Sequence, residues 1–240
     1  MKKVLLTIGA MAMATGVFAQ GYVTLGNGSG TLIDTNQILS PFLGGPGGGV
    51  QNVGTSATSV GASPLYYVAL LTMPYSGTLT TATNPYSAND GWIYTGISTQ
   101  NKPSGQPGTV SQLTDVATAS GTWGIGTTQQ FMIVAWSANL GSSWLAVSNT
   151  LDNPALLSAQ LDGGAEYGYL GVSAVSFEAA QPAPSAPAAV LWSSTLGGQT
   201  YGNPISTGIP LYQIIVPEPT TLALAVLGGL SLVLIRRRKS

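Results

Sequence analysis

Glycine and proline divide this chain into short apolar segments, and this punctuation constrains the fold more than any other feature. The 240 residues include 32 glycines and 15 prolines, whereas charged residues make up only 6% of the chain. Glycine and proline disfavour the interior of long helices, while the intervening segments are rich in Val, Thr and Tyr, which favour strands. The hydrophobic content of 44% is sufficient for a buried core, so we expect a folded body.

Several segments between these breaks predict strands. Two of them, LYYVALLTM at 65–73 and FMIVAW at 131–136, are continuously apolar, which indicates strands that are covered on both faces. Short strands joined by turn-rich segments predict a mainly β fold, a β-sandwich of Ig-like or jelly-roll type with one short helix. The predicted strands cover 22–25, 65–73, 92–97, 131–136, 171–177, 190–192 and 211–215.

One segment has the start and stop residues of a helix. Asn153 can cap it, Pro154 suits the first helical position, and a glycine pair follows the helix formers that end at Leu161. We therefore predict a helix over 153–161. The segment 144–147 is compatible with either a helical turn or a strand.

Charge is concentrated at the two ends of the chain. The body between them keeps Lys102 as its single basic residue, against seven carboxylates. Nucleic acid binding needs several Lys or Arg side chains to displace counterions from phosphates. We therefore expect no nucleic acid partner.

The N-terminus has the three parts of an export signal. Lys2 and Lys3 form a positive start, an apolar stretch follows as far as Val17, and small residues precede a cleavage position between Ala19 and Gln20. Residues 1–19 are therefore predicted to be a signal peptide. The chain has no cysteine, which excludes disulfide bonds and cysteine acylation.

The C-terminus combines an apolar segment with a basic end. LALAVLGGLSLVLI at 222–235 has no charge, and Arg236, Arg237, Arg238 and Lys239 follow at once. As a helix this segment would rise about 21 Å, less than the hydrocarbon core of roughly 30 Å, so it needs local thinning of the bilayer or snorkelling arginines. We predict a transmembrane helix at 221–235 with the basic residues as a cytoplasmic stop-transfer signal.

A proline-containing segment stands directly before this apolar tail. It consists of Val216, Pro217, Glu218, Pro219 and Thr220. The two prolines remove backbone donors and fix φ, so the segment is expected to stay extended and accessible to a processing enzyme. In this order, the VPEPT segment, the short apolar span and the arginine-rich end resemble the PEP-CTERM sorting signal of Gram-negative bacteria, over roughly the last 25 residues.

The resemblance implies a route through the cell and not an activity. A tail of this kind implies recognition by an exosortase, anchoring of the precursor in the inner membrane, cleavage near the motif, and delivery to the outer envelope or extracellular matrix. Such tails are also associated with exopolysaccharide export. The chain is thus predicted to comprise a signal peptide at 1–19, a glycine-rich body at 20–215 and a sorting tail at 216–240.

Histidine and cysteine are both absent, which removes most catalytic designs. Neither a Ser-His-Asp nor a Cys-His nucleophile can be built, nor a His-ligated zinc site. Asp152, Asp162, Glu166 and Glu178 are close in sequence, but their spacing does not require a glycosidase pair, and 162–166 lacks the dense acidic pattern of a calcium loop. We expect a non-enzymatic protein without a cofactor or a bound metal.

Aromatic residues are the strongest candidates for a ligand site in the body. The five tryptophans and ten tyrosines could supply flat rings that stack against sugars. Trp123, in a glycine-rich turn, and Trp92, which opens a predicted strand, are the two candidate stacking residues; alternatively, the rings form the core. Two functions follow: an exported structural protein of the envelope or matrix, or a carbohydrate-binding surface module.

Overall fold

The computed structural model describes most of the body between the two termini. The described residues are 20–35, 51–52, 66–80, 90–102, 107–119, 121–153, 156–157, 168–182, 188–192 and 202–214. The predicted signal peptide at 1–19 and the predicted transmembrane helix at 221–235 lie outside these ranges.

Strands dominate the described body. Their bounds are β1 (Tyr22–Leu25), β2 (Ile33–Thr35), β3 (Gln51–Asn52), β4 (Tyr66–Pro74), β5 (Ile93–Gln100), β6 (Leu113–Ala117), β7 (Thr128–Ser137), β8 (Gly168–Val172), β9 (Ser176–Ala179), β10 (Ala189–Val190) and β11 (Ile209–Ile214). A 3-10 helix, η2 (Ala138–Leu140), and an α-helix, α2 (Trp144–Leu151), follow β7.

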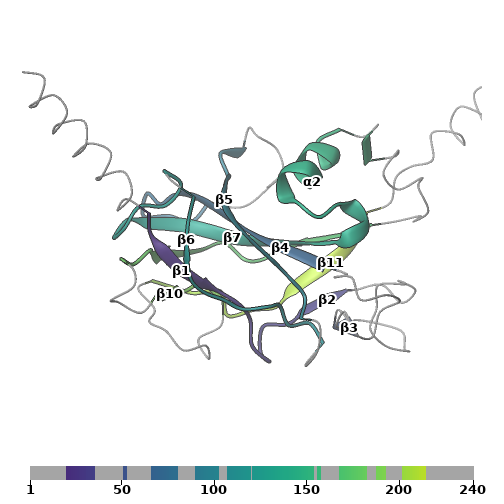
Figure 1. Ribbon diagram of the computed structural model, residues 1–240, viewed down its shortest axis with the longest axis horizontal. Coiled ribbons are helices and arrows are strands. Elements are labelled where there is room, and N and C mark those ends of the chain that lie inside the picture. The colour runs from purple at the N-terminus through teal and green to yellow at the C-terminus, as the bar shows by residue number, and fades with distance from the viewer. Residues whose placement is uncertain are drawn as a thin grey trace, which may run out of the picture.

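The strands form two mixed sheets that pack against each other (Figure 1). The larger sheet has the order β3-β2-β11-β8-β7-β4-β5, with β9 also paired to β7, and the smaller sheet has the order β10-β1-β6. The longest antiparallel pair joins β4 to β7, from Tyr66 opposite Ser137 to Pro74 opposite Gln129. The prediction of a mainly β fold is confirmed, and a sandwich fits the arrangement of the sheets.

The main core lies between the two sheets. Val23 and Leu25 of β1 face alternate residues of β4 and β7, among them Val68 and Ile133, and all four are fully buried. Because side chains alternate across a strand, only every second residue of β4 and β7 points into this layer. The remaining residues of both strands require a second apolar layer on the opposite face.

That second layer is supplied by the helical segment after β7. Trp144 and Val147 of α2, with Leu140 of η2, pack on Met132 and Trp136 of β7. In Figure 1, α2 lies over the face of the larger sheet that is turned away from β1 and β10. The prediction that both continuously apolar strands are covered on both faces is therefore confirmed.

The position of the helix differs from the sequence prediction. The segment 144–147, which could have been strand or helix, is the start of α2, and the Ser143 hydroxyl caps it by accepting a backbone N–H from the first turn. The predicted helix at 153–161 is only partly described. Within it, Leu157 is helical and its N–H donates to the Asn153 carbonyl at 3.0 Å.

The predicted strand at 171–177 is two strands. β8 and β9 both pair with β7, one after the other, and residues 173–175 separate them. Ser173 keeps this connection attached to β7. Its N–H donates to the Ile133 carbonyl at 2.8 Å, and its hydroxyl accepts the Ile133 N–H at 2.9 Å. A local polar side chain has replaced regular ladder pairing there.

Candidate functional site

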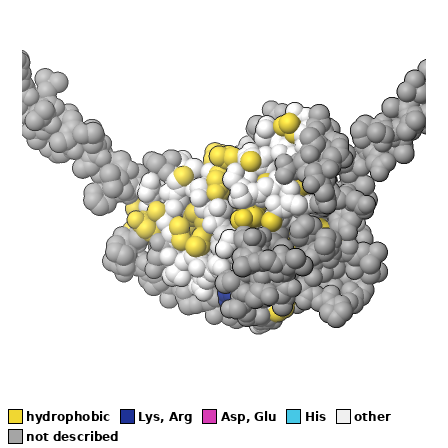
Figure 2. Space-filling view, turned by 45° about the vertical axis from the view of Figure 1, so that its right-hand side comes forward, with side chains coloured by type: hydrophobic (Ala, Val, Ile, Leu, Met, Phe, Trp, Pro, Cys, Tyr) yellow, Lys and Arg dark blue, Asp and Glu magenta, His cyan; other side chains and the backbone are white. Residues whose placement is uncertain are grey.

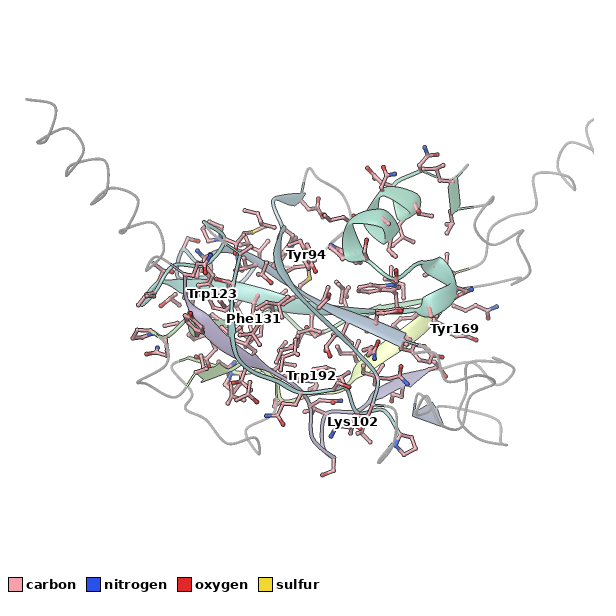
Figure 3. The ribbon with its side chains drawn as sticks, in the orientation of Figure 1. Tyr94, Lys102, Trp123, Phe131, Tyr169 and Trp192 are labelled. Atoms are coloured by element: carbon pink, nitrogen blue, oxygen red, sulfur yellow. The ribbon has the colours of Figure 1, made fainter. Side chains whose placement is uncertain are left out.

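Trp123 does not lie on the surface. Its ring is only 1% exposed and packs against Phe131, with the ring centroids 5.9 Å apart (Figure 3). The indole N–H donates to the Thr127 carbonyl at 2.9 Å, which gives this buried polar group the partner it needs. The burial of Trp123 agrees with the alternative that this ring belongs to the core, because the side chain of the glycine-rich turn points inward.

The other tryptophans are also mainly structural. Trp136, Trp144 and Trp192 are buried, and Trp192 donates its indole N–H to the Thr207 carbonyl at 3.0 Å. Trp92 is half-buried and packs against the cluster beneath α2. Stacking of Trp92 on a sugar stays a prediction, whereas the core interpretation accounts for the other tryptophans.

A groove lies along the outer strand of the larger sheet, next to the segment before α2. Its volume is about 320 Å³, and its lining residues all have uncharged side chains: Tyr67, Ser98, Thr99, Gln100, Ser111 and Ser142. The register of β4 and β5 places Tyr67 opposite Gln100 and Ala69 opposite Ser98. These four side chains therefore point to the same face of the sheet.

A chain of contacts fixes the wall of the groove that contains Tyr67. The Tyr67 ring stacks on Trp136, with the centroids 5.9 Å apart and the planes inclined by 23°. Trp136 in turn donates its indole N–H to the Gly141 carbonyl at 2.8 Å, directly before Ser142. The buried tryptophan thus positions both the aromatic ring and the serine that line the groove.

The opposite wall is also held by hydrogen bonds. The Thr99 hydroxyl donates to the Ser111 carbonyl at 2.7 Å, and the Ser111 N–H donates to the Gln100 carbonyl at 2.8 Å. These bonds join β5 to the segment before β6 and leave the exposed Gln100 side chain directed away from the core. The groove is a shallow polar site with one aromatic side.

Sequence reasoning did not identify this groove. Tyr67 stands inside a continuously apolar run, which marks it as a core residue, and the serines are indistinguishable from those of any loop. The pairing register of β4 and β5 brings Tyr67 beside Gln100 and Ser98, and contacts distant in sequence add Ser111 and Ser142.

The acids singled out by the sequence occupy different environments. Glu178 is fully buried in β9, whereas Asp152 is exposed at the end of α2. Asp162 and Glu166 lie outside the described residues. Within the described ranges, no group of three or more His, Cys, Asp or Glu residues is placed to hold a metal ion.

The pKa of Asp34 is shifted. Asp34 lies in β2 between Pro210 of β11 and Asn52 of β3. Burial removes water from the carboxylate and raises the pKa of Asp34 above its ordinary value, and the backbone hydrogen bond that lowers it is the smaller effect.

The last described strand leads directly to the predicted sorting tail. β11 lies in the interior of the larger sheet, parallel to β2 and antiparallel to β8. Its last residue, Ile214, packs against the cluster beneath α2, and only Ile215 separates it from Val216. A firmly paired strand therefore precedes the segment in which cleavage is expected.

The tail itself matches a known family model. The model of the PEP-CTERM protein-sorting motif matches residues 216–239. The chain carries a PEP-CTERM protein-sorting motif. The match covers the VPEPT segment (Val216 to Thr220), the apolar span and the basic residues Arg236 to Lys239, which all lie outside the described residues.

The PEP-CTERM motif supports the coarser features of the predicted route. It supports an exported protein that is anchored at the membrane before processing and is sorted by an exosortase. Among the residues whose structure is described, no helix has the length and hydropathy required to span a membrane. No curated protein and no solved structure matches this PEP-CTERM chain.

Proposed function

We propose that this chain is a non-enzymatic structural protein of the outer envelope or extracellular matrix, delivered by exosortase sorting and cut near Pro217 to Thr220. The observation that supports it is the junction between β11 and the motif. The body ends in β11, whose first half pairs with β2 and whose last three residues pair with β8, and the matched tail begins two residues later. Cleavage within the motif would therefore leave the sheet intact.

The body suits a passive extracellular role. It contains neither histidine nor cysteine, so neither a histidine-activated nucleophile nor thiol chemistry can be built from this sequence. In Figure 2, small groups of hydrophobic side chains lie among uncharged side chains and backbone on the described surface, and a basic side chain is visible near its lower edge. A surface of this kind can associate with hydrated matrix polymers, exopolysaccharide among them, through hydrogen bonds and without ion pairing.

Intact-mass measurement of the protein from the envelope fraction and from the medium tests this proposal. The expected species begins at Gln20 and has lost about 20 C-terminal residues, because the motif is the site of processing. Any added mass identifies what the exosortase has attached. A mature protein that retains its tail through Lys239 would show that the chain is an ordinary membrane-anchored protein.

A pair of proline variants makes the measurement specific. Replacing Pro217 and Pro219 by alanine should block processing, because the extended conformation of the motif is lost. Replacing Pro182, an exposed proline of the body, by alanine is the matched control and should leave processing unchanged. Equal processing of both variants would contradict the assignment of the motif as the recognised segment.

A further inference from the structure

We propose that the groove lined by Tyr67, Ser98, Thr99, Gln100, Ser111 and Ser142 binds a short stretch of a neutral saccharide. This inference goes beyond the structural role proposed above, because sorting and matrix delivery do not require a ligand site. It also assigns the site to residues other than Trp92 and Trp123.

The shape and aromatic wall of the groove fit a sugar ring. A volume of about 320 Å³ is at the small end of ligand sites, which commonly run from about 300 to 1,000 Å³. Tyr67 is half-buried, and its stacking on Trp136 holds the ring in one orientation. A fixed aromatic ring loses little conformational entropy on binding and can contact the C–H face of a pyranose.

The polar lining supplies both hydrogen-bond donors and hydrogen-bond acceptors. Ser98, Ser142 and the Gln100 amide are exposed at the groove, and each of these groups can both donate and accept. Sugar hydroxyls likewise donate and accept, so the two surfaces are complementary. Thr99 is different, because its hydroxyl is committed to the Ser111 carbonyl and acts as a fixed part of the wall.

The absence of charged side chains in the lining determines which class of saccharide the groove favours. None of the described lining residues is charged, and the body has one lysine against seven carboxylates. Uronate, sulfate or phosphate groups would lose hydration without gaining a cationic partner. The groove is therefore expected to favour a neutral saccharide over an anionic one.

Affinity electrophoresis of the full chain in detergent tests this proposal. Native gels contain dextran, hydroxyethylcellulose, galactomannan or, as the anionic comparison, alginate. We expect retardation by at least one neutral polymer and none by alginate. Retardation by none of the neutral polymers, or by alginate alone, overturns the proposal.

Variants locate the site. Tyr67→Ala should weaken the apparent affinity about tenfold through loss of the aromatic contact. Because this change also uncovers Trp136, two further variants at exposed positions, Gln100→Ala and Ser98→Val, remove an amide and fill the groove while leaving the core intact. Both should reduce retardation.

Tyr212→Ala is the matched aromatic control. Tyr212 is 57% exposed on β11 and lies outside the groove, so its loss should not alter mobility. An equal loss of retardation in Tyr212→Ala, or full retardation in folded Gln100→Ala and Ser98→Val, would overturn the assignment. Failure here leaves the mass measurement of the sorting tail unaffected, so the two proposals are judged separately.

Discussion

The substitution Gly171→Ala tests how tightly β8 packs against β11, the strand that precedes the tail. Gly171 lies in β8, which pairs with β11 on one side and β7 on the other. A Cβ added there would press on the Pro210 carbonyl oxygen and lie 2.8 Å from Leu211 Cδ2. The leucine side chain can rotate, but the carbonyl belongs to β11, so the strand itself would have to shift.

The expected cost follows from two opposing effects. Overpacking in a well-packed interior costs about 1–3 kcal/mol. Replacing glycine by alanine lowers the entropy of the unfolded chain, which raises the free energy of unfolding by about 0.4–1 kcal/mol where the backbone conformation suits alanine. We therefore expect Gly171→Ala to lower the free energy of unfolding by about 1–2 kcal/mol, which for a body of this size lowers Tm by about 2–8 °C.

Urea unfolding of the full chain in detergent, followed by tryptophan fluorescence, measures this difference. Gly30→Ala is the control, because a Cβ at Gly30 has no neighbour within 4 Å. This control should be neutral or slightly stabilising. If Gly171→Ala is as stable as the parent protein while Gly30→Ala behaves as expected, the close contact between β8 and β11 does not govern the stability of the fold.

Three further changes test other parts of the account. Burial raises the folded-state pKa of Asp34 above the ordinary 3.8, so the stability of the parent protein falls as the pH rises through the shifted pKa. Asp34→Asn should therefore raise the free energy of unfolding at pH 7 and lose this advantage near pH 3. Equal thermal stability of the two proteins across this pH range would refute the prediction. Trp123→Phe should lower the free energy of unfolding by about 1–3 kcal/mol, because the smaller ring leaves a cavity in the core and the hydrogen bond to the Thr127 carbonyl is lost. A neutral result in urea would argue against a structural role. Replacing Arg236, Arg237 and Arg238 by serine should reduce membrane retention of the precursor, and unchanged retention on fractionation would count against the stop-transfer role.

Local patterns predicted the strands that form the centre of the fold. The apolar runs at 65–73 and 131–136 became β4 and β7, because continuous apolarity reports burial on both faces whatever the partner is. The strands β2, β3 and β6 were missed. Each is short and contains Asp, Asn, Gln or Thr, so long-range pairing and not local propensity makes it a strand.

The candidate sites divide in the same way. The sorting tail could be recognised from sequence because its parts are contiguous and act through composition and order. The fate of Trp123 could not, since a glycine-rich turn fixes the backbone and does not determine which way the ring points. The groove at Tyr67 depends on the pairing register of β4 and β5. No local pattern in the sequence indicates that register.

The pairing of β11 with β2 determines when the larger sheet of the body can finish folding. Ile33 near the start of the body is opposite Ile209 near its end, so the larger sheet cannot close until almost the whole polypeptide has passed through the export channel. Until then the chain lacks an interior strand of that sheet. In a chain exported from its N-terminus, the larger sheet would therefore close only when residues close to the sorting motif are available to pair.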